Sequence, residues 1–205
     1  VWRQSDKYHV PKIVFVNKMD RTGADFFAVV KGIEERLDAH VAVLQVPLGA
    51  EDKFKGIIDL IEMKAYVYEE ESQGKKFDVL DIPDEYQEIS KEYHHILVEK
   101  VSALDDALTQ KFLENPESIT QDELKKALRA GTIANKIVPI ICGASFKNKG
   151  VQKLLDTITL YLPSPLDLPP IKGHDVEDPE KEIERKLDYR EPFAGLAFKV
   201  QSDPH

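Results

Sequence analysis

The chain has 205 residues, of which 42% are hydrophobic and 32% are charged, and its formal net charge at pH 7 is −9. This composition is that of a folded, water-soluble protein and excludes disordered, collagen-like and low-complexity classes. The longest apolar runs are far shorter than the roughly 18 residues that a membrane-spanning helix needs, so the sequence predicts no membrane segment.

Cysteine usage and the first residues predict the setting in which the protein works. The single Cys142 cannot form an internal disulfide and ends an apolar run, which is typical of a buried thiol in the reducing cytoplasm. No signal or transit segment is recognisable. Because the sequence begins with Val1 and its only methionines are Met19 and Met63, we expect the chain to be a piece of a longer protein.

The excess negative charge lies in one internal segment. Residues 41–135 contain 20 acidic and 11 basic residues, whereas the two kinds balance in the rest of the chain. Such a segment is not expected to bind phosphate backbones directly. It indicates either an ordinary solvated surface or an acidic face for a basic partner, and both interpretations remain open.

Two strand–helix units predict an open α/β sheet. After a short helix over 2–8, the apolar run 13–16 is typical of a strand buried on both faces of a parallel sheet. Asp25 can cap a following helix over 26–37. The second unit has a strand over 137–142 and a helix over 151–162, and right-handed crossovers would bring the two units into one sheet.

The segment between these units indicates a small inserted α+β subdomain. It predicts strands over 41–46, 56–61, 65–68 and 77–82, a turn at Gln73-Gly74, and helical patterns over 84–112 and, capped by Thr120, over 121–131.

The C-terminal part is expected to be largely irregular. The proline-rich run 162–170 predicts a stiff, extended linker, and the charged residues 177–190 predict a solvated loop. Residues 195–200 indicate the first strand of a domain that the chain does not complete.

Polar residues follow the first buried strand, where open α/β sheets bind ligands. The Asp20 carboxylate can accept hydrogen bonds from the ring N–H and the exocyclic amine of guanine, whereas adenine presents an acceptor there. Lys18 can lay its aliphatic stem along the base, and the Asn17 amide can join the base edge to neighbouring loops. The competing interpretation is an ordinary polar turn after a strand.

The loop after the second strand supplies a second set of candidates. Small residues let backbone N–H groups approach a ligand, here the guanine carbonyl oxygen that adenine lacks. Alone, this loop is more simply explained as a strand-to-helix turn, but beside Asp20 on a neighbouring strand it strengthens the nucleotide hypothesis. The candidate residues of this loop are Ala144, Ser145 and Phe146.

Long blocks of the sequence resemble the bacterial translation elongation factor G family. They are Trp2-Arg3-Gln4, VPKIVFVNKMDRTGADF, GIIDLIEMKAYVYE, DIPDEY, FKNKGVQ, YLPSPLDLPPIKG and PFAGLAFKV, and together they extend over essentially the whole chain. The resemblance implies that residues 1–40 and 136–162 are the C-terminal half of a GTPase domain with a P-loop GTPase-type partial sheet. It also implies an inserted subdomain over 41–135, a linker over 163–190 and the start of a β-barrel domain over 191–205.

The resemblance also implies the ligand and its contacts. GTP or GDP would be the nucleotide, and the family's guanine-specificity motif falls on Asn17, Lys18 and Asp20. The family's second guanine loop usually reads Ser-Ala, and here the order is Ala144-Ser145, which should be tolerated because the contacts are made by backbone N–H groups. The sequence contains no G-x-x-x-x-G-K-[ST] motif, so we expect neither the Mg²⁺ ligands nor a catalytic residue in this chain, and no metal site or GTP hydrolysis by the chain alone.

The partners implied by the resemblance are those of a ribosome-dependent GTPase, monomeric when complete, that drives translocation of tRNA and mRNA. The inserted subdomain would dock the ribosomal stalk protein through a helix that carries Glu85, Glu88, Glu92 and Glu99, whose spacing places them on one helical face. Two alternatives remain: a ribosomal protection protein or class II release factor, and a non-catalytic scaffold that docks on the ribosome.

Overall fold

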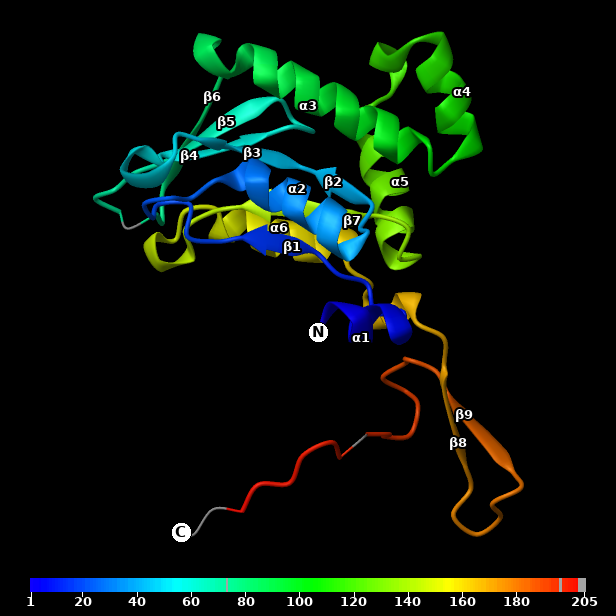
Figure 1. The fold of residues 1–205 in the computed structure, drawn as a ribbon. Helices are drawn as coiled ribbons and strands as arrows, with labels where there is room; N and C mark the ends of the chain where they lie inside the picture. The colour runs from blue at the N-terminus through cyan, green and yellow to red at the C-terminus, as the bar shows by residue number, and fades with distance from the viewer. Residues whose placement is uncertain (73, 196, 203–205) are drawn as a thin grey trace. The chain divides into compact units, whose positions relative to one another are not determined.

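The computed structural model describes residues 1–72, 74–195 and 197–202. The chain divides into two compact units, residues 1–162 and 163–205, which are described separately. The first unit contains a parallel sheet, an antiparallel sheet and six α-helices among its described residues (Figure 1). The expected mixed α/β fold is therefore confirmed.

The parallel sheet has three strands in the order β1-β7-β2. Its central strand β7 is buried at all five residues, as expected of a valine- and isoleucine-rich strand covered on both faces. The bounds are β1 (Val14–Val16), β2 (Val41–Val43) and β7 (Val138–Cys142), and the helices that precede or follow these strands in the chain are α1 (Trp2–Lys7), α2 (Phe26–Leu37) and α6 (Val151–Tyr161).

The helix α2 begins where the sequence predicts. The Asp25 side chain accepts a hydrogen bond of 3.0 Å from the Ala28 N–H and so satisfies one of the donors that a helix N-terminus leaves unpaired. Phe26 and Val30 on its inner face are buried in the core. The cap and the apolar face together fix the start and the orientation of α2 beside the sheet.

The antiparallel sheet has the strand order β3-β4-β5-β6, and three helices accompany it in the chain. Thr120 and Glu123 form a reciprocal capping box that begins α5, as expected. The bounds are β3 (Gln45–Leu48), β4 (Gly56–Asp59), β5 (Lys64–Tyr68), β6 (Phe77–Leu80), α3 (Asp84–Ser102), α4 (Asp106–Glu114) and α5 (Gln121–Ile133). Residue 73, where part of a turn was expected, lies outside the described residues.

The predicted strand over 41–46 is two strands that belong to different sheets. Val41–Val43 pairs in parallel with β7, and Gln45–Leu48 pairs in antiparallel with β4. Leu44 joins them: its N–H donates to the Ile140 carbonyl, and its carbonyl accepts from the Leu60 N–H. The expected inserted segment starts at residue 41, whereas the antiparallel sheet starts only at residue 45.

The helical pattern predicted over 84–112 is interrupted. Helix α3 ends at Ser102, and Asp105 caps α4 by accepting a hydrogen bond of 3.0 Å from the Leu108 N–H. Apolar residues continue at helical spacing across the break because both helices bury a face in the same core. The apolar periodicity therefore continues through the turn between α3 and α4, and the local sign of a break is the capping residue Asp105.

The second unit differs from the predicted linker and loop. Ile171–His174 (β8) and Glu182–Arg185 (β9) form an antiparallel hairpin, so part of the expected solvated loop is a strand. Pro165–Asp167 forms a short 3₁₀ turn within the expected extended run. Residues 191–195 and 197–202 form no strand, because a strand requires a hydrogen-bonded neighbour and the described part of this unit supplies none for them.

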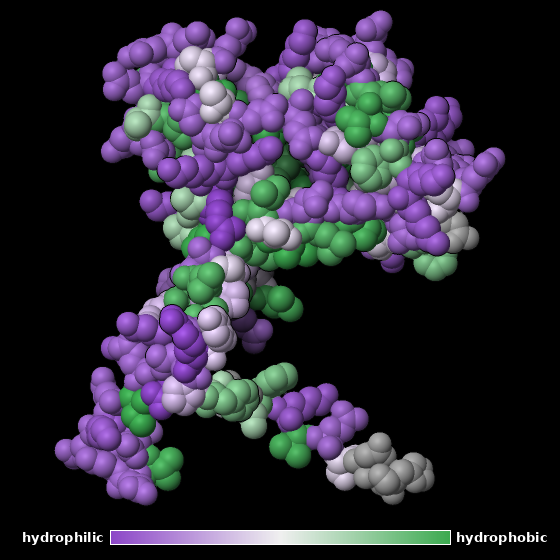
Figure 2. All heavy atoms as spheres, turned by 180° about the vertical axis from the view of Figure 1, so that it is seen from behind, coloured by the Kyte–Doolittle hydropathy of each residue, from purple (hydrophilic) through white to green (hydrophobic). Residues whose placement is uncertain are grey.

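The core of the first unit is continuous across both sheets. Some hydrophobic side chains nevertheless remain exposed, including Leu155, Ile158 and Leu160 on α6. Seen from behind, hydrophobic residues gather in a band across this unit (Figure 2). No helix within the described ranges is long and apolar enough to cross a membrane.

Candidate functional site

Two loops leave neighbouring strands of the parallel sheet at the same edge. Val16 at the end of β1 stands opposite Cys142 at the end of β7. Beyond the strands, the Gly143 N–H donates to the Val16 carbonyl at 3.0 Å, and the Met19 N–H donates to the Gly143 carbonyl at 3.1 Å. The expected proximity of the two candidate loops is therefore confirmed.

Asn17 ties the two loops together through its side chain. Its Oδ1 accepts hydrogen bonds from the Ser145 N–H at 2.9 Å and from the Lys18 N–H at 2.8 Å, and its Nδ2 donates to Ser145 Oγ at 2.8 Å. The Ser145 hydroxyl thus has a partner within the protein. Asn17 and Ser145 are 128 positions apart in the sequence, and the hydrogen bonds between them fix the spacing between the two loops.

Asp20 lies close to the second loop as well. Its Oδ2 is 3.3 Å from Nζ of Lys147, and its side chain is only 13% exposed. A nearly buried carboxylate with one cation beside it keeps further lone pairs for other donors. Lys147, on the 3₁₀ turn Ser145–Lys147, is a neighbour of the candidate site that sequence reasoning missed, because nothing in the local pattern distinguishes it from a surface lysine.

The backbone donors of the second loop are partly engaged within the protein. The Ala144 N–H donates to the Lys149 carbonyl at 2.9 Å, and the Ser145 N–H donates to Asn17. Outside the helices and strands of the described residues, no backbone carbonyl accepts a hydrogen bond from the Phe146 N–H. The Phe146 ring is 96% exposed and the Lys18 side chain is also exposed, so both are open to a ligand.

A groove of about 710 Å³ runs from the first loop along α2. Asn17 and Lys18 line it at the loop, and residues of α2 such as Val29 and Ile33 line the rest. Two of the candidate residues at the end of β1 therefore border the groove. One of them, Lys18, has a left-handed backbone with φ of +63°, a conformation that few non-glycine residues adopt.

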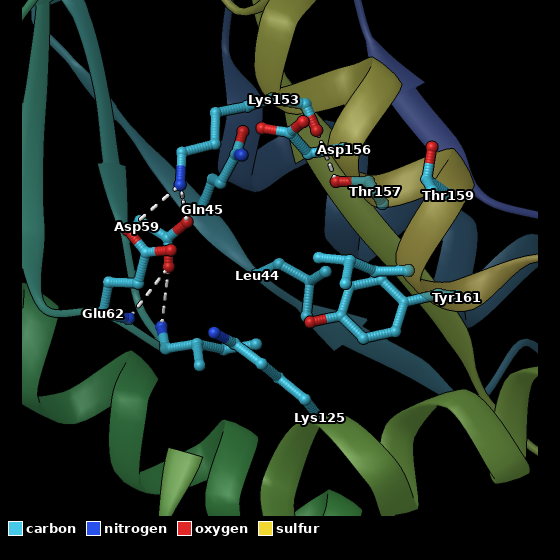
Figure 3. Close-up of a pocket in the computed structure, with 12 residues that line it drawn as sticks. Leu44, Gln45, Asp59, Glu62, Lys125, Lys153, Asp156, Thr157, Thr159 and Tyr161 are labelled. Carbon is cyan, nitrogen blue, oxygen red and sulfur yellow. Dashed lines mark hydrogen bonds and ion pairs between the residues drawn. The ribbon is translucent and has the colours of Figure 1, made fainter. Parts of the chain in front are cut away.

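A second cavity, of about 250 Å³, lies between the antiparallel sheet and α6 (Figure 3). Lys153 points from α6 toward the sheet, where its Nζ is 3.0 Å from Asp59 Oδ2 and 3.1 Å from Glu62 Oε2 (Figure 3). The same ammonium lies 4.0 Å from the centre of the Tyr66 ring. The charges of Lys153, Asp59 and Glu62 are satisfied by one another, which favours a structural role for this cluster.

The pKa values of this cluster are displaced in opposite directions. Burial by itself lowers the pKa of Lys153, but the adjacent Asp59 carboxylate and the hydrogen bonds to Tyr66, Asp59 and Glu62 outweigh burial and raise it. Burial by itself raises the pKa of Glu62, but hydrogen bonds from Tyr66 and Lys153 outweigh it and lower the pKa. Both groups are thus stabilised in their charged forms.

The described residues contain no cluster of side chains of the kinds that most often bind metal ions. Across residues 1–72, 74–195 and 197–202, no group of three or more His, Cys, Asp or Glu side chains is placed to hold a metal ion. The four glutamates expected to form a docking face for a partner protein all lie on α3; they are Glu85, Glu88, Glu92 and Glu99.

Comparison with known proteins identifies relatives of this arrangement. The model of the elongation factor Tu GTP binding domain family matches residues 1–164. Among solved structures, a crystal structure of a protein from Thermus thermophilus is 27% identical with a TM-score of 0.72, covering 84% of this chain and 26% of that protein. The chain thus spans about a quarter of the length of that structure.

Proposed function

The chain belongs to the elongation factor Tu GTP binding domain family, and we propose that it supplies the guanine-recognising part of a GTPase that acts on the ribosome. The observation that carries this proposal is the hydrogen-bonded junction of Asn17 and Ser145, which holds the two candidate loops together beside the Asp20 carboxylate. The roles of the six candidate residues in nucleotide binding are part of this proposal.

The proposed mechanism of recognition uses groups that this chain contains. The Asp20 carboxylate accepts hydrogen bonds from the ring N–H and the exocyclic amine of guanine. The aliphatic stem of Lys18 and the Phe146 ring can pack against the faces of the base. Because Ala144 and Ser145 already donate within the protein, we assign the guanine carbonyl oxygen to the Phe146 N–H. Adenine would place an acceptor against the carboxylate and leave it unpaired.

We further propose that the complete protein is an elongation factor of the G type, which uses GTP to drive movement of tRNA and mRNA through the ribosome in the cytoplasm. The blocks of resemblance over the whole chain, including the inserted segment, support this type over a ribosomal protection protein or a class II release factor. Phosphate binding and hydrolysis require a P-loop that this sequence does not contain.

Base selectivity tests the proposal directly. We expect the chain to bind guanosine at least about tenfold more tightly than adenosine or inosine. Adenosine presents an acceptor to Asp20, and inosine lacks the amine that would donate a hydrogen bond to it. Titration of the ¹⁵N-labelled chain with each nucleoside, followed by amide chemical shifts at residues 17–20 and 144–146, measures this ratio. Equal affinities for the three nucleosides would refute guanine recognition.

An Asp20→Asn variant sharpens the test. An asparagine amide can donate to the 2-carbonyl oxygen of xanthine, where guanine carries an amine, so this variant should prefer xanthosine to guanosine. Asp38→Asn, an exposed aspartate at the end of α2, is the matched control and should retain the wild-type preference. An equal loss of affinity for all nucleosides in Asp20→Asn would indicate damage to the loop rather than a change in base recognition.

The stalk-protein partner needs its own experiment. The four glutamates on α3 offer an acidic face for a basic partner. We expect Glu88→Lys combined with Glu92→Lys to weaken binding of the purified stalk protein by about tenfold or more at low salt. The control combines Glu71→Lys with Glu117→Lys, which makes the same charge change away from α3. Equal binding by both double variants would exclude α3 as the docking face.

A further inference from the structure

We infer that Glu51, which lies between β3 and β4 in the inserted segment, is a positioning residue for Asp20. The inference rests on the proposed function, because Asp20 is the group proposed to recognise guanine. Glu51 is distant from Asp20 in sequence, and no motif of the chain includes it. Its role follows from two hydrogen bonds to the loop that carries Asp20.

The two hydrogen bonds attach to the loop on either side of Asp20. The Glu51 N–H donates to the carbonyl of Met19 at 3.0 Å. The Glu51 Oε1 accepts from the N–H of Gly23 at 2.7 Å. The residue before Asp20 and the residue three positions after it are therefore held by the same glutamate, which restricts the backbone that aims the carboxylate.

The backbone of this region is unusual in a way that needs such support. Lys18, Gly23 and Glu51 all have positive φ angles, of +63°, +81° and +54°. A non-glycine residue in this region of φ carries a conformational cost and persists where the surrounding contacts require it. At Glu51 the paired contacts to Met19 and Gly23 are such a requirement, and they include an acceptor that is charged and therefore stronger than a neutral one.

The second candidate loop is held from the same segment. Lys149, whose side chain is 3% exposed, donates from Nζ to the Phe54 carbonyl at 2.9 Å and lies 3.3 Å from Glu70 Oε1. The Lys149 carbonyl in turn accepts the Ala144 N–H. Residues 51–54 thus contact both loops, so a change in this segment reaches both sides of the proposed base site.

Substitutions at Glu51 separate positioning from general stability. Glu51→Ala removes the acceptor for the Gly23 N–H, and we expect guanosine affinity to fall about tenfold, equivalent to about 1.4 kcal/mol. Glu51→Gln keeps an acceptor oxygen and should stay within about threefold of the wild type. Asp52→Asn makes the same loss of charge at the next, exposed position and should leave affinity unchanged.

Three readouts on the complete chain test the inference. Hydrogen exchange without nucleoside should show the Gly23 amide exchanging about tenfold faster in Glu51→Ala than in the wild type, because its acceptor is gone. Amide shifts should change at Asp20. Guanosine and adenosine titrations should show a smaller guanosine preference in Glu51→Ala, whereas partial unfolding would lower both affinities in proportion.

Each outcome decides a separate statement. If the wild type binds guanosine and Glu51→Ala retains the same affinity and the same Asp20 shift, the positioning role is wrong. If the wild type shows no guanosine preference, the proposed function fails, and the positioning of the loop is then judged by Gly23 exchange and Asp20 shifts alone. If Glu51→Gln loses as much affinity as Glu51→Ala, the hydrogen bond to Gly23 is not the cause, and the inference is overturned.

Discussion

Replacing Lys153 by methionine should destabilise the first unit because it leaves two carboxylates without their cation. Lys153 and Asp59 are 12% and 13% exposed at the side chain, and Glu62 is 33% exposed. Methionine preserves most of the aliphatic volume of lysine, so the change acts mainly on charge. The pair Lys31–Glu35, separated by 3.7 Å on the surface of α2, provides the matched comparison.

The magnitude follows from the burial of the partners. Removing one member of a buried ion pair typically costs about 3–5 kcal/mol. Two features favour the lower end: Glu62 is partly solvated, and Asp59 still accepts the N–H groups of Ile61 and Glu62, each at 3.0 Å. We therefore expect Lys153→Met to lower the free energy of unfolding by about 3 kcal/mol, against less than about 0.5 kcal/mol for Lys31→Met.

The pH dependence of this difference has a definite sign. The pKa of folded Lys153 lies above its ordinary value of 10.5, so its contribution is complete below pH 10.5 and is lost as the pH rises further. The pKa of folded Glu62 lies below its ordinary value of 4.5, so its contribution is present above pH 4.5 and is lost on acidification. The difference between wild type and Lys153→Met should therefore be largest between these limits and shrink below pH 4.5.

Urea unfolding followed by circular dichroism at about 222 nm is the assay. Every α-helix of the described residues lies in the first unit, so this helical signal reports that unit. Linear extrapolation for the wild type, Lys153→Met and Lys31→Met gives the two differences in unfolding free energy. Equal costs for the two substitutions would refute the argument from burial.

Three further predictions use other groups of the chain. A hydrogen bond from Lys111 and, to a smaller extent, one from the Thr120 N–H lower the pKa of Glu123 to about 2. An NMR titration should show this midpoint, Lys111→Met should move it toward 4.5, and the stabilisation by Glu123 should be present above pH 4.5 and lost as the pH falls toward 2. Burial raises the pKa of Cys142, so the folded chain should not react with a thiol reagent near pH 8, whereas the urea-unfolded chain should react fully. Lys147 competes for the Asp20 carboxylate, so Lys147→Met should strengthen guanosine binding by up to about threefold at low salt, and this gain should vanish above about 0.5 M salt.

The elements with local signals were predictable from the sequence. The strand at Val14–Val16 and the helix capped by Asp25 each carry an apolar pattern and a polar boundary within a few residues. The capping box of Thr120 and Glu123 is likewise a local signal. In these places the signal for the element lies within one short window, which is the condition under which sequence patterns are informative. The expected burial of the first strand on both faces is wrong, because β1 is an edge strand and only Val16 is buried, whereas Val14 and Phe15 are half-buried.

The elements that depend on distant partners were not predictable. Val41–Val43 and Gln45–Leu48 form one apolar run, and only their pairing with β7 and β4 assigns them to different sheets. The β8–β9 hairpin has almost no apolar face, since β8 is exposed at all four residues and β9 alternates only between exposed and half-buried residues, so the sequence gives little sign of a strand there. Residues 197–200 carry strand propensity, but the described part of the chain offers them no neighbouring strand, and propensity alone does not make a strand.

The candidate site shows the same division. The residues after β1 and β7 could be predicted as candidates because open sheets bind ligands where strands end. Lys147 could not, because its relation to Asp20 depends on how the 3₁₀ turn folds back toward β1. Glu51 could not either, since its two partners lie 28 or more positions earlier in the chain.

The placement of Glu51 links the β3–β4 connection to the loop that carries Asp20, the residue proposed to recognise guanine. If Met19 and Gly23 are held by Glu51 only when the loop adopts the conformation that aims Asp20, then guanine binding and the order of residues 51–54 must favour each other. The coupling is reciprocal, so a partner that reorganises the β3–β4 connection would weaken nucleotide binding by the same factor by which nucleotide opposes that partner. Comparing hydrogen exchange at residues 51–54 with and without saturating guanosine measures this factor, and exchange that is unaffected by guanosine would mean that the two are independent.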